Sequence, residues 1–269
     1  MRKVSFYCIS LLSLLTAMVQ ADDLTVSSAP RSQNINQPAI SIIIDDMGYR
    51  LISGQRAINL PGAITYSFLP HAPHVKQLSG TAYKQNKEVM LHLPMEAEAG
   101  KKLGPGGLME CMSEKKFAEV LQSSIRSVPH VSGFNNHMGS LLTKSPLWMK
   151  RLMQQVAAKN RLFFVDSRTT SDSVAMEVAH SEGLSSIQRD IFIDHEESKE
   201  FIQKQLRKLI RKAQRNGTAL AIAHPKKVTL AELEQWLPLL ETKGVKLVPV
   251  SQLITLRQQR KIALWKKKK

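Results

Sequence analysis

The chain has 269 residues, of which 43% are hydrophobic and 22% charged, so it is long enough to bury the core of one large domain or of two small ones. Its formal net charge is +16 at pH 7, and its cysteines are Cys8 and Cys111. Cys8 falls in a segment that we expect to be removed, which excludes an internal disulfide and leaves histidine and carboxylate as the available metal ligands.

Residues 1–21 have the features of a secretory signal peptide. Arg2 and Lys3 form a positive amino end, an apolar run follows, and Val19-Gln20-Ala21 is a small-x-small cleavage site. An uncleaved anchor helix is the alternative, but the apolar run is short for a membrane span. We therefore expect a periplasmic or otherwise exported protein, in which the polar residues 22–39 form a flexible leader before the folded domain.

From Ile40 onward, strand-like and helix-like patterns alternate. Apolar runs predict strands over residues 40–45, 63–69, 88–93, 131–135, 162–166, 187–193, 219–223 and 245–250. Amphipathic segments predict helices over residues 114–128, 147–159, 173–182, 199–215 and 230–242. The expected residues at their amino ends are, in the same order, Ser113, Ser145-Pro146, Asp172, Ser198 and Thr229. Such alternation places parallel strands inside a layer of helices, so residues 40–255 are predicted to form an α/β fold, a (β/α) barrel of about seven to eight strands. A doubly wound open sheet is the alternative.

Two basic segments bear on the choice of partner. The predicted helix 199–215 carries one apolar stripe and is basic elsewhere, without aromatic side chains interleaved among the charges. This pattern indicates a solvated outer face of a barrel helix and not a nucleic-acid surface. The tail 256–269 has seven positive charges and no negative one, so it could contact an anionic surface or be a disordered, solubilising end. An exported protein meets little nucleic acid, and we expect no nucleic-acid partner.

Chemically active side chains follow the predicted strands. Asp45 and Asp46 lie at the carboxyl end of the first predicted strand, and five of the eight histidines lie at or just after the ends of later strands. Those histidines are His71, His92, His137, His195 and His224. Singly, each is more often structural, and a turn Asp followed by a helix N-cap would explain the adjacent pair. Because the carboxyl ends of parallel strands meet at one rim, the groups together predict a site for zinc or another divalent ion.

A metal-dependent hydrolase has a use for each of these groups. Two histidines and one carboxylate hold the ion, the second carboxylate accepts a proton from water, and a histidine on the far side protonates the leaving group. We expect Asp45 and Asp46 to point differently, so that one is a ligand and the other a base. The Gly-x-Ser-x-Gly of a serine hydrolase and the glycine loops that bind phosphate are absent, which disfavours those chemistries.

Six segments, in chain order, resemble the polysaccharide deacetylases, and more closely their divergent branch, the divergent polysaccharide deacetylases of the bacterial envelope. These segments are Ile44-Asp45-Asp46-Met47-Gly48, Leu91-His92-Leu93-Pro94-Met95-Glu96, Asn136-His137-Met138-Gly139-Ser140, Phe164-Val165-Asp166-Ser167-Arg168, Arg189-Asp190-Ile191-Phe192-Ile193-Asp194 and Ala223-His224-Pro225. The resemblance implies a distorted (β/α) barrel and a metal-dependent removal of acyl groups from sugars. It also implies an envelope polysaccharide or peptidoglycan-type glycan as the substrate.

The resemblance assigns roles to four residues. Asp45 matches the catalytic base of the family, and Asp46 matches its metal-binding Asp. His137 matches the first His of the second motif, which is a metal ligand, and His224 matches the late His that acts as the acid. These assignments agree with the division of labour expected from the residues alone.

Two departures from the family pattern shift the expected roles. The usual second motif has another His four residues after the first, where this chain has Leu141, so we expect His92 to supply the missing metal ligand. The usual Arg-x-Pro-x-Gly of the middle motif is absent, and Asp166 and Arg168 take its place in orienting the base. Two hypotheses follow: a hydrolase of envelope carbohydrate, and a catalytically inactive protein that binds a glycan or a partner on the same barrel.

Overall fold

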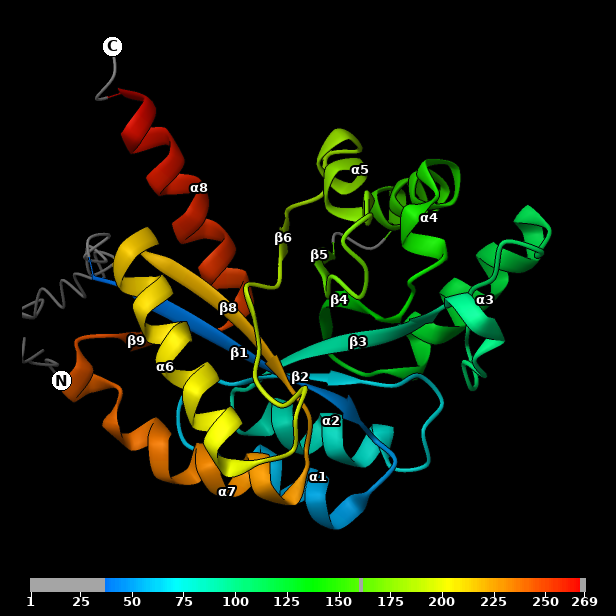
Figure 1. Ribbon diagram of the computed structural model, residues 1–269. Helices are drawn as coiled ribbons and strands as arrows, with labels where there is room; N and C mark the ends of the chain where they lie inside the picture. Colours follow the sequence, from blue (N-terminus) through cyan, green and yellow to red (C-terminus); the bar gives the residue numbers. More distant parts are fainter. Residues whose placement is uncertain (1–36, 160–161, 267–269) are drawn as a thin grey trace, which may run out of the picture. The chain divides into compact units, whose positions relative to one another are not determined.

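An all-parallel sheet that curls into an open half-barrel is the frame of the fold (Figure 1). The computed structural model describes residues 37–159 and 162–266, and within them nine strands pair in the order β6-β5-β4-β3-β2-β1-β8-β7, with β9 beside the start of β1. The strands are β1 (Ala39–Met47), β2 (Thr65–Phe68), β3 (Glu88–Met95), β4 (Val131–Met138), β5 (Phe163–Asp166), β6 (Ser186–Gln188), β7 (Ile191–Phe192), β8 (Thr218–Ala223) and β9 (Lys246–Leu247). This confirms the predicted barrel-type α/β fold.

Eight α-helices lie within the described residues. They are α1 (Leu51–Ile58), α2 (Val75–Lys84), α3 (Glu114–Ser127), α4 (Pro146–Lys159), α5 (Ala175–Ser181), α6 (Lys199–Asn216), α7 (Lys227–Trp236) and α8 (Val250–Lys266). Short 3₁₀ turns cover Glu98–Gly100, Leu142–Lys144, Leu237–Leu239 and Glu241–Lys243. As predicted, Ser113 and Ser198 cap α3 and α6, each accepting a hydrogen bond at 3.3 Å from the backbone N–H three residues later.

The predicted strand 187–193 is wrong as a single element. It divides into β6, which pairs with β5, and β7, which pairs with β8, so its two halves lie at opposite edges of the sheet. The break falls at Arg189-Asp190. The Asp190 carboxylate accepts the backbone N–H of Leu220 at 2.8 Å and also binds Arg257, which anchors the chain to β8 and α8. Two charged residues thus leave the half-barrel open between its edges.

The predicted strand 245–250 also differs from the structure. Its strand part shortens to β9, because α8 begins at Val250 with the backbone N–H groups of Val250 and Ser251 donating to the Glu88 carboxylate. The carboxylate stabilises the positive amino end of α8. Helix α8 then continues through Lys266, so residues 256–266 of the basic tail are helical and not disordered.

Alternation along the strands divides the core into two layers. Ile40, Ile42 and Ile44 of β1 pack outward with residues of the covering helices, while Ile43 packs inward. The inner layer joins apolar residues of five strands to the buried face of α8. Its members include Ile43, Met90, Val165, Ile187, Leu220, Ile222, Leu253 and Leu256. Helix α8 thereby closes the half-barrel at the amino ends of the strands, and the opposite rim remains for the polar groups.

Several predictions lie outside the described residues. These are the signal peptide, residues 1–21, and nearly all of the leader, residues 22–39, of which Ala39 already belongs to β1. In the part of the chain that the structure describes, none of the helices has the length and apolar character needed to cross a bilayer.

Candidate metal centre

The inward-facing positions change from apolar to polar at the carboxyl ends of the strands. On β1, the inward Ile43 is followed two residues later by Asp45, and on β3 the inward Met90 is followed by His92. Asp45 and His92 are almost completely buried. Because side chains alternate along a strand, the polar groups lie next to the inner apolar layer, toward the carboxyl ends of the strands.

A β-bulge places the second carboxylate beside the first. The pairing of β1 with β2 shifts register between Ile44 and Met47, and Asp46 adopts a left-handed backbone conformation with φ 55°. The bulge breaks the alternation, so both carboxylates reach the same atom: Nε2 of His92 lies 3.6 Å from Asp45 and 3.3 Å from Asp46. Asp45 and Asp46 were expected to point differently. Their carboxylates instead approach the same Nε2 of His92 and differ in their other partners, which are Asn135 for Asp45 and His137 for Asp46.

Asp46, His92 and His137 bring three ligand atoms together. Oδ1 of Asp46 and Nε2 of His92 each lie 3.1 Å from Nδ1 of His137, and the possible ligand atoms of the three residues lie within 4.8 Å of one another. Oδ1 of Asp46 is buried and has no hydrogen-bond partner. A buried carboxylate oxygen beside two imidazole nitrogens suits a cation, and these donors are the ones that zinc prefers. The three residues therefore fit a divalent metal ion.

Asn135 fixes the orientation of His92. Nδ1 of His92 lies 2.9 Å from Oδ1 of Asn135, and an amide oxygen only accepts, so the ring proton resides on Nδ1. Nε2 then presents its lone pair to Asp46 and His137. Oδ1 of Asn135 also accepts from Ser67, and its Nδ2 donates to Asp45. This outer contact selects the tautomer of His92 that can bind a metal.

The pKa values follow from this crowding. Burial raises the pKa of Asp45 above its usual range. Burial also opposes ionisation of Asp46, but the contacts with His137 and His92 outweigh it and hold the pKa of Asp46 well below its usual range. Burial disfavours the charged form of His92, yet Asp45 and Asp46 beside it raise its pKa to about 8. Asp46 is therefore the ionised carboxylate of the candidate metal-binding group, and Asp45 is the carboxylate with the higher proton affinity.

His224 lies on another side of the Asp46, His92 and His137 cluster and is paired with the carboxylate of Asp194. Its Nδ1 lies 3.0 Å from Oδ1 of Asp194, and its Nε2 lies 3.8 Å from Oδ2 of Asp46. Asp194 is buried and also accepts from the backbone N–H of His224 and the hydroxyl of Thr229. Burial opposes protonation of His224, but the bond to Asp194 prevails and raises its pKa. The hydroxyl of Thr229 does not cap a helix as predicted, and α7 begins at Lys227.

Among the described residues, Asp166 forms no hydrogen bond with Asp45. Its Oδ1 accepts the backbone N–H of Arg168 and its Oδ2 accepts the hydroxyl of Ser173, both at 2.8 Å. Asp166 thus stabilises the turn in which Arg168 holds a left-handed conformation with φ 53°. The Arg168 side chain lines a cavity next to the metal-binding residues. The prediction that Asp166 and Arg168 orient Asp45 is therefore not supported by a hydrogen bond between these residues and Asp45 among the described residues.

The remaining histidines after strands separate into two cases. His71 is exposed in the turn after β2, where its backbone N–H donates to Ser127. His195 is exposed next to the ring of Phe192 and lines the same cavity as Arg168. Asn135 and Asp194 were not among the predicted site residues. Asn135 points inward on β4 two residues before His137, and Asp194 lies two residues after the end of β7. These positions are the signals that would have indicated them.

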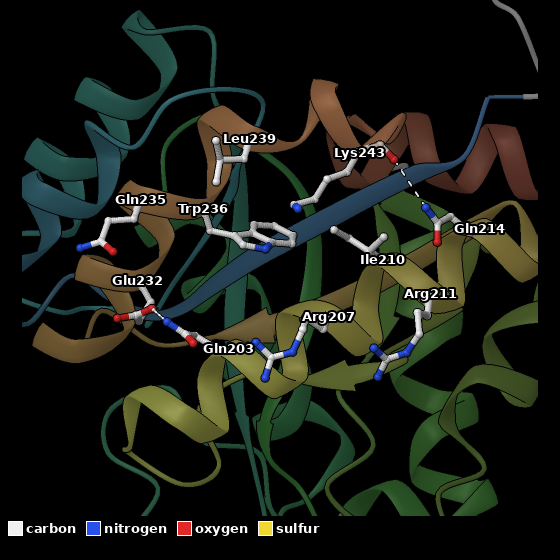
Figure 2. A pocket seen from close by; sticks show the side chains of 10 residues that line it. All are labelled: Gln203, Arg207, Ile210, Arg211, Gln214, Glu232, Gln235, Trp236, Leu239 and Lys243. Carbon is white, nitrogen blue, oxygen red and sulfur yellow. Dashed lines mark hydrogen bonds between the residues drawn. The ribbon is translucent and has the colours of Figure 1, made fainter.

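Two cavities meet at the cluster, and both are lined by His137 and His224. One, of about 600 Å³, includes Asp45 and His92, and the other, of about 1160 Å³, includes Asp46. A third hollow of about 550 Å³ lies between α6 and α7 and is lined by Trp236 and basic side chains of α6 (Figure 2). That hollow contains no histidine or ligand triad. The candidate metal-binding and acid–base side chains therefore lie at the carboxyl-end rim of the half-barrel and not in this hollow.

Comparison with known proteins agrees with this geometry. The divergent polysaccharide deacetylase family matches residues 42–254, which hold all of the rim residues described above. The chain belongs to this family. The YibQ protein of Escherichia coli K12 is 34% identical over 196 residues, covering 73% of this chain and 61% of that protein. A protein of Haemophilus influenzae Rd is 36% identical over 200 residues, covering 74% of this chain and 70% of that protein. The match to YibQ thus spans less than two thirds of its length.

Solved structures share the fold of this family member. Protein ATU2773 of Agrobacterium tumefaciens C58 superposes with a TM-score of 0.77 at 23% identity, covering 81% of this chain and 89% of that one. A mutant of the peptidoglycan deacetylase PdaC of Bacillus subtilis gives a TM-score of 0.52 at 13% identity, covering 87% of this chain and 98% of that one. A mutant of BA3943, a CE4 family pseudoenzyme, gives a TM-score of 0.50 at 15% identity, covering 81% and 68%. At these identities the likeness concerns the fold alone.

Proposed function

We propose that the protein is a metal-dependent hydrolase that removes N-acetyl or other acyl groups from carbohydrate of the cell envelope. The observation that carries the proposal is the convergence of Asp46, His92 and His137 around a buried carboxylate oxygen without a hydrogen-bond partner. Family membership supports the choice of an acylated polysaccharide or peptidoglycan-type glycan as substrate. The signal-peptide pattern of residues 1–21 supports an exported, periplasmic location.

The residues of the rim divide the chemical work. A divalent ion, zinc by the donor set, would be held by Asp46, His92 and His137 and would supply Lewis acidity toward the acyl carbonyl oxygen. Asp45 has a pKa raised by burial, so it is suited to take the proton of an attacking water. Asn135 donates to both of its oxygens at 2.9 and 3.0 Å and keeps the carboxylate facing the cluster.

His224 supplies the complementary acid. Asp194 accepts from Nδ1 and leaves Nε2 directed to the Asp46 side of the cluster. The raised pKa of His224 favours the imidazolium, which protonates the departing amine or alcohol. A base and an acid thus flank the position at which an acyl carbon would lie, as hydrolysis of an amide or ester requires.

Two measurements on one protein sample test the proposal. The full chain is purified without chelators, its metal content is determined by elemental analysis, and acetate release from N-acetylated and O-acetylated glycans is followed. We expect about one divalent ion per chain and acetate release that a chelator abolishes. Asp46→Asn should lose both, whereas Asp172→Asn, which removes the same charge from an exposed loop residue, should lose neither.

The outcomes separate the hydrolase from the binding protein. A chain without bound metal under these conditions contradicts the proposed centre. A chain that holds metal, binds glycan and releases no acetate from any substrate supports the alternative of a catalytically inactive glycan-binding protein on the same barrel.

A further inference from the structure

Cations gather in the smaller of the two cavities that meet at the metal-binding residues. This cavity has a volume of about 600 Å³, and its lining includes Lys101, Arg168 and Arg189. The one carboxylate in that wall is Asp45, whose two oxygens already accept from Asn135. Three positive charges and one carboxylate therefore line this space, so its wall carries an excess of positive charge.

Arg189 is held rigidly at this place. Its Nε donates to the carbonyl oxygen of Ser167 at 2.7 Å, and its NH2 donates to the carbonyl oxygen of Arg168 at 3.0 Å. Its Cζ lies 5.0 Å from the ring centroid of Phe192. These contacts fix the guanidinium plane, and carbonyl oxygens do not cancel its charge.

Among the residues that the structure describes, neither Arg168 nor Arg189 forms a direct ion pair with a carboxylate, although the charges of Asp166 and Asp45 act on Arg189. The nearest acidic neighbour in sequence, Asp190, forms ion pairs with Lys212 and Arg257 and not with Arg189. Burial lowers the pKa of Arg189 and outweighs the attraction of Asp166 and Asp45, and repulsion from Arg168 adds to the lowering. Two adjacent, partly buried guanidinium groups without a direct carboxylate contact keep hydrogen-bond donors available for an anion.

The backbone at Arg168 shows that this placement is maintained against strain. Arg168 adopts the left-handed region with φ 53°, which non-glycine residues seldom occupy, and the buried Asp166 holds the turn by accepting its N–H. Asp166 therefore holds Arg168 in a strained backbone conformation, with its side chain in the wall of the cavity.

We propose that this cavity binds the anionic group of the substrate, so that the substrate is an acylated glycan carrying a carboxylate or a phosphate. Arg168, Arg189 and Lys101 would hold the anion, and the ring of Phe192 would pack on the adjoining sugar. Phe192 also lies 5.5 Å, between ring centroids, from His224, which connects the anion site to the proposed acid. The inference rests on the proposed function for the acyl group and adds the charge of the substrate to it.

The test compares oligosaccharides that differ only in charge. The metal-loaded full chain is titrated calorimetrically with an N-acetylglucosamine oligomer, with the same oligomer carrying a lactyl carboxylate, and with the same oligomer carrying a 6-phosphate. We expect an anionic oligomer to bind about tenfold more tightly than the neutral one, a preference that salt weakens. The arm with the tighter binding identifies the group as carboxylate or phosphate.

Variants assign the preference to the cavity. Arg168→Gln and Lys101→Gln should each reduce the ratio of anionic to neutral affinity. Lys101 is exposed, so that K101Q keeps the test valid if R168Q is poorly folded. Arg207→Gln removes an equal charge from α6, in the hollow shown in Figure 2, and should keep the ratio.

Three results would overturn the inference: equal affinity for neutral and anionic oligomers, a preference unchanged in R168Q and K101Q, or no binding of any oligomer by the unmodified chain. If only the hydrolase proposal is wrong, the protein would still bind the anionic oligomer more tightly but would release no acetate. Equal acetate release from the neutral and anionic oligomers, with equal affinities, would retain the hydrolase and refute the anion site.

Discussion

The side-chain amide of Asn135 donates to both carboxylate oxygens of Asp45, at 2.9 and 3.0 Å. The same residue accepts at its oxygen from His92, so one uncharged side chain joins the proposed base to a proposed metal ligand. Such a bridge keeps Asp45 out of the metal-binding set, although its carboxylate lies within 3.6 Å of the same His92 nitrogen. The separate roles of two adjacent carboxylates thus depend on a residue of another strand.

Asn135→Ala should weaken metal binding without removing any ligand. It frees Nδ1 of His92 from its acceptor, and loss of such an outer contact lowers metal affinity by about 10- to 100-fold. Competition with a zinc-binding dye measures the effect. Ser132→Ala on the same strand, which removes a hydroxyl bound to the Val89 carbonyl, is the matched control. Unchanged affinity in N135A would show that the His92 tautomer is fixed elsewhere.

Metal affinity should fall as the pH is lowered through about 8, the pKa of His92 in the metal-free protein. Below that value His92 holds a proton on the nitrogen that would bind the ion, so the proton and the metal compete. Dissociation constants across a pH series spanning this value, with the metal buffered, measure the slope. Affinity independent of pH over this range would exclude His92 as a ligand.

Asp194→Asn should impair catalysis while the metal stays bound. An amide at this position no longer favours the imidazolium of His224 and permits the other tautomer, and loss of a general acid costs about 10²- to 10⁴-fold in rate. Acetate release at saturating glycan and elemental analysis of the same sample give the two readouts. Loss of metal together with activity would instead make Asp194 a structural support of the cluster.

Glu88→Gln should destabilise the fold by about 1.5–3 kcal/mol, the range for hydrogen bonds to a charged group. Its carboxylate accepts from the backbone N–H groups at the start of α8 and from the hydroxyl of Thr65. Urea unfolding provides the free energy. Glu234→Gln, which breaks an exposed ion pair with Arg56, should cost less than about 1 kcal/mol. Equal losses in the two variants would contradict the role of Glu88.

The sequence predicted the convergence of the rim residues for a clear physical reason. In a parallel sheet the carboxyl ends of all strands lie on one side, so Asp45, His92, His137 and His224 had to approach one another once the strands were identified. The residues predicted to hold a metal ion, Asp46, His92 and His137, lie together in the fold as a group that could hold one. Local pattern and parallel topology sufficed for this part.

Other features depend on contacts between distant segments and have no local pattern. The bulge at Asp46 arises where β1 pairs with β2 in shifted register, and the partner of His224 lies 30 residues earlier, at Asp194. The division of residues 187–193 between two sheet edges results from Asp190 binding the backbone of β8. None of these could be derived from the spacing of residues along one strand.

Helix α8 determines when the protein can finish folding. Leu253 and Leu256 complete the inner apolar layer, although β1 and β3, against which this layer forms, precede them by more than 150 residues. The half-barrel therefore keeps an uncovered apolar interior until residues 250–256 have emerged. Such late, long-range closure slows folding and prolongs exposure of the interior. The cover of the apolar interior is thus the last α-helix among the described residues.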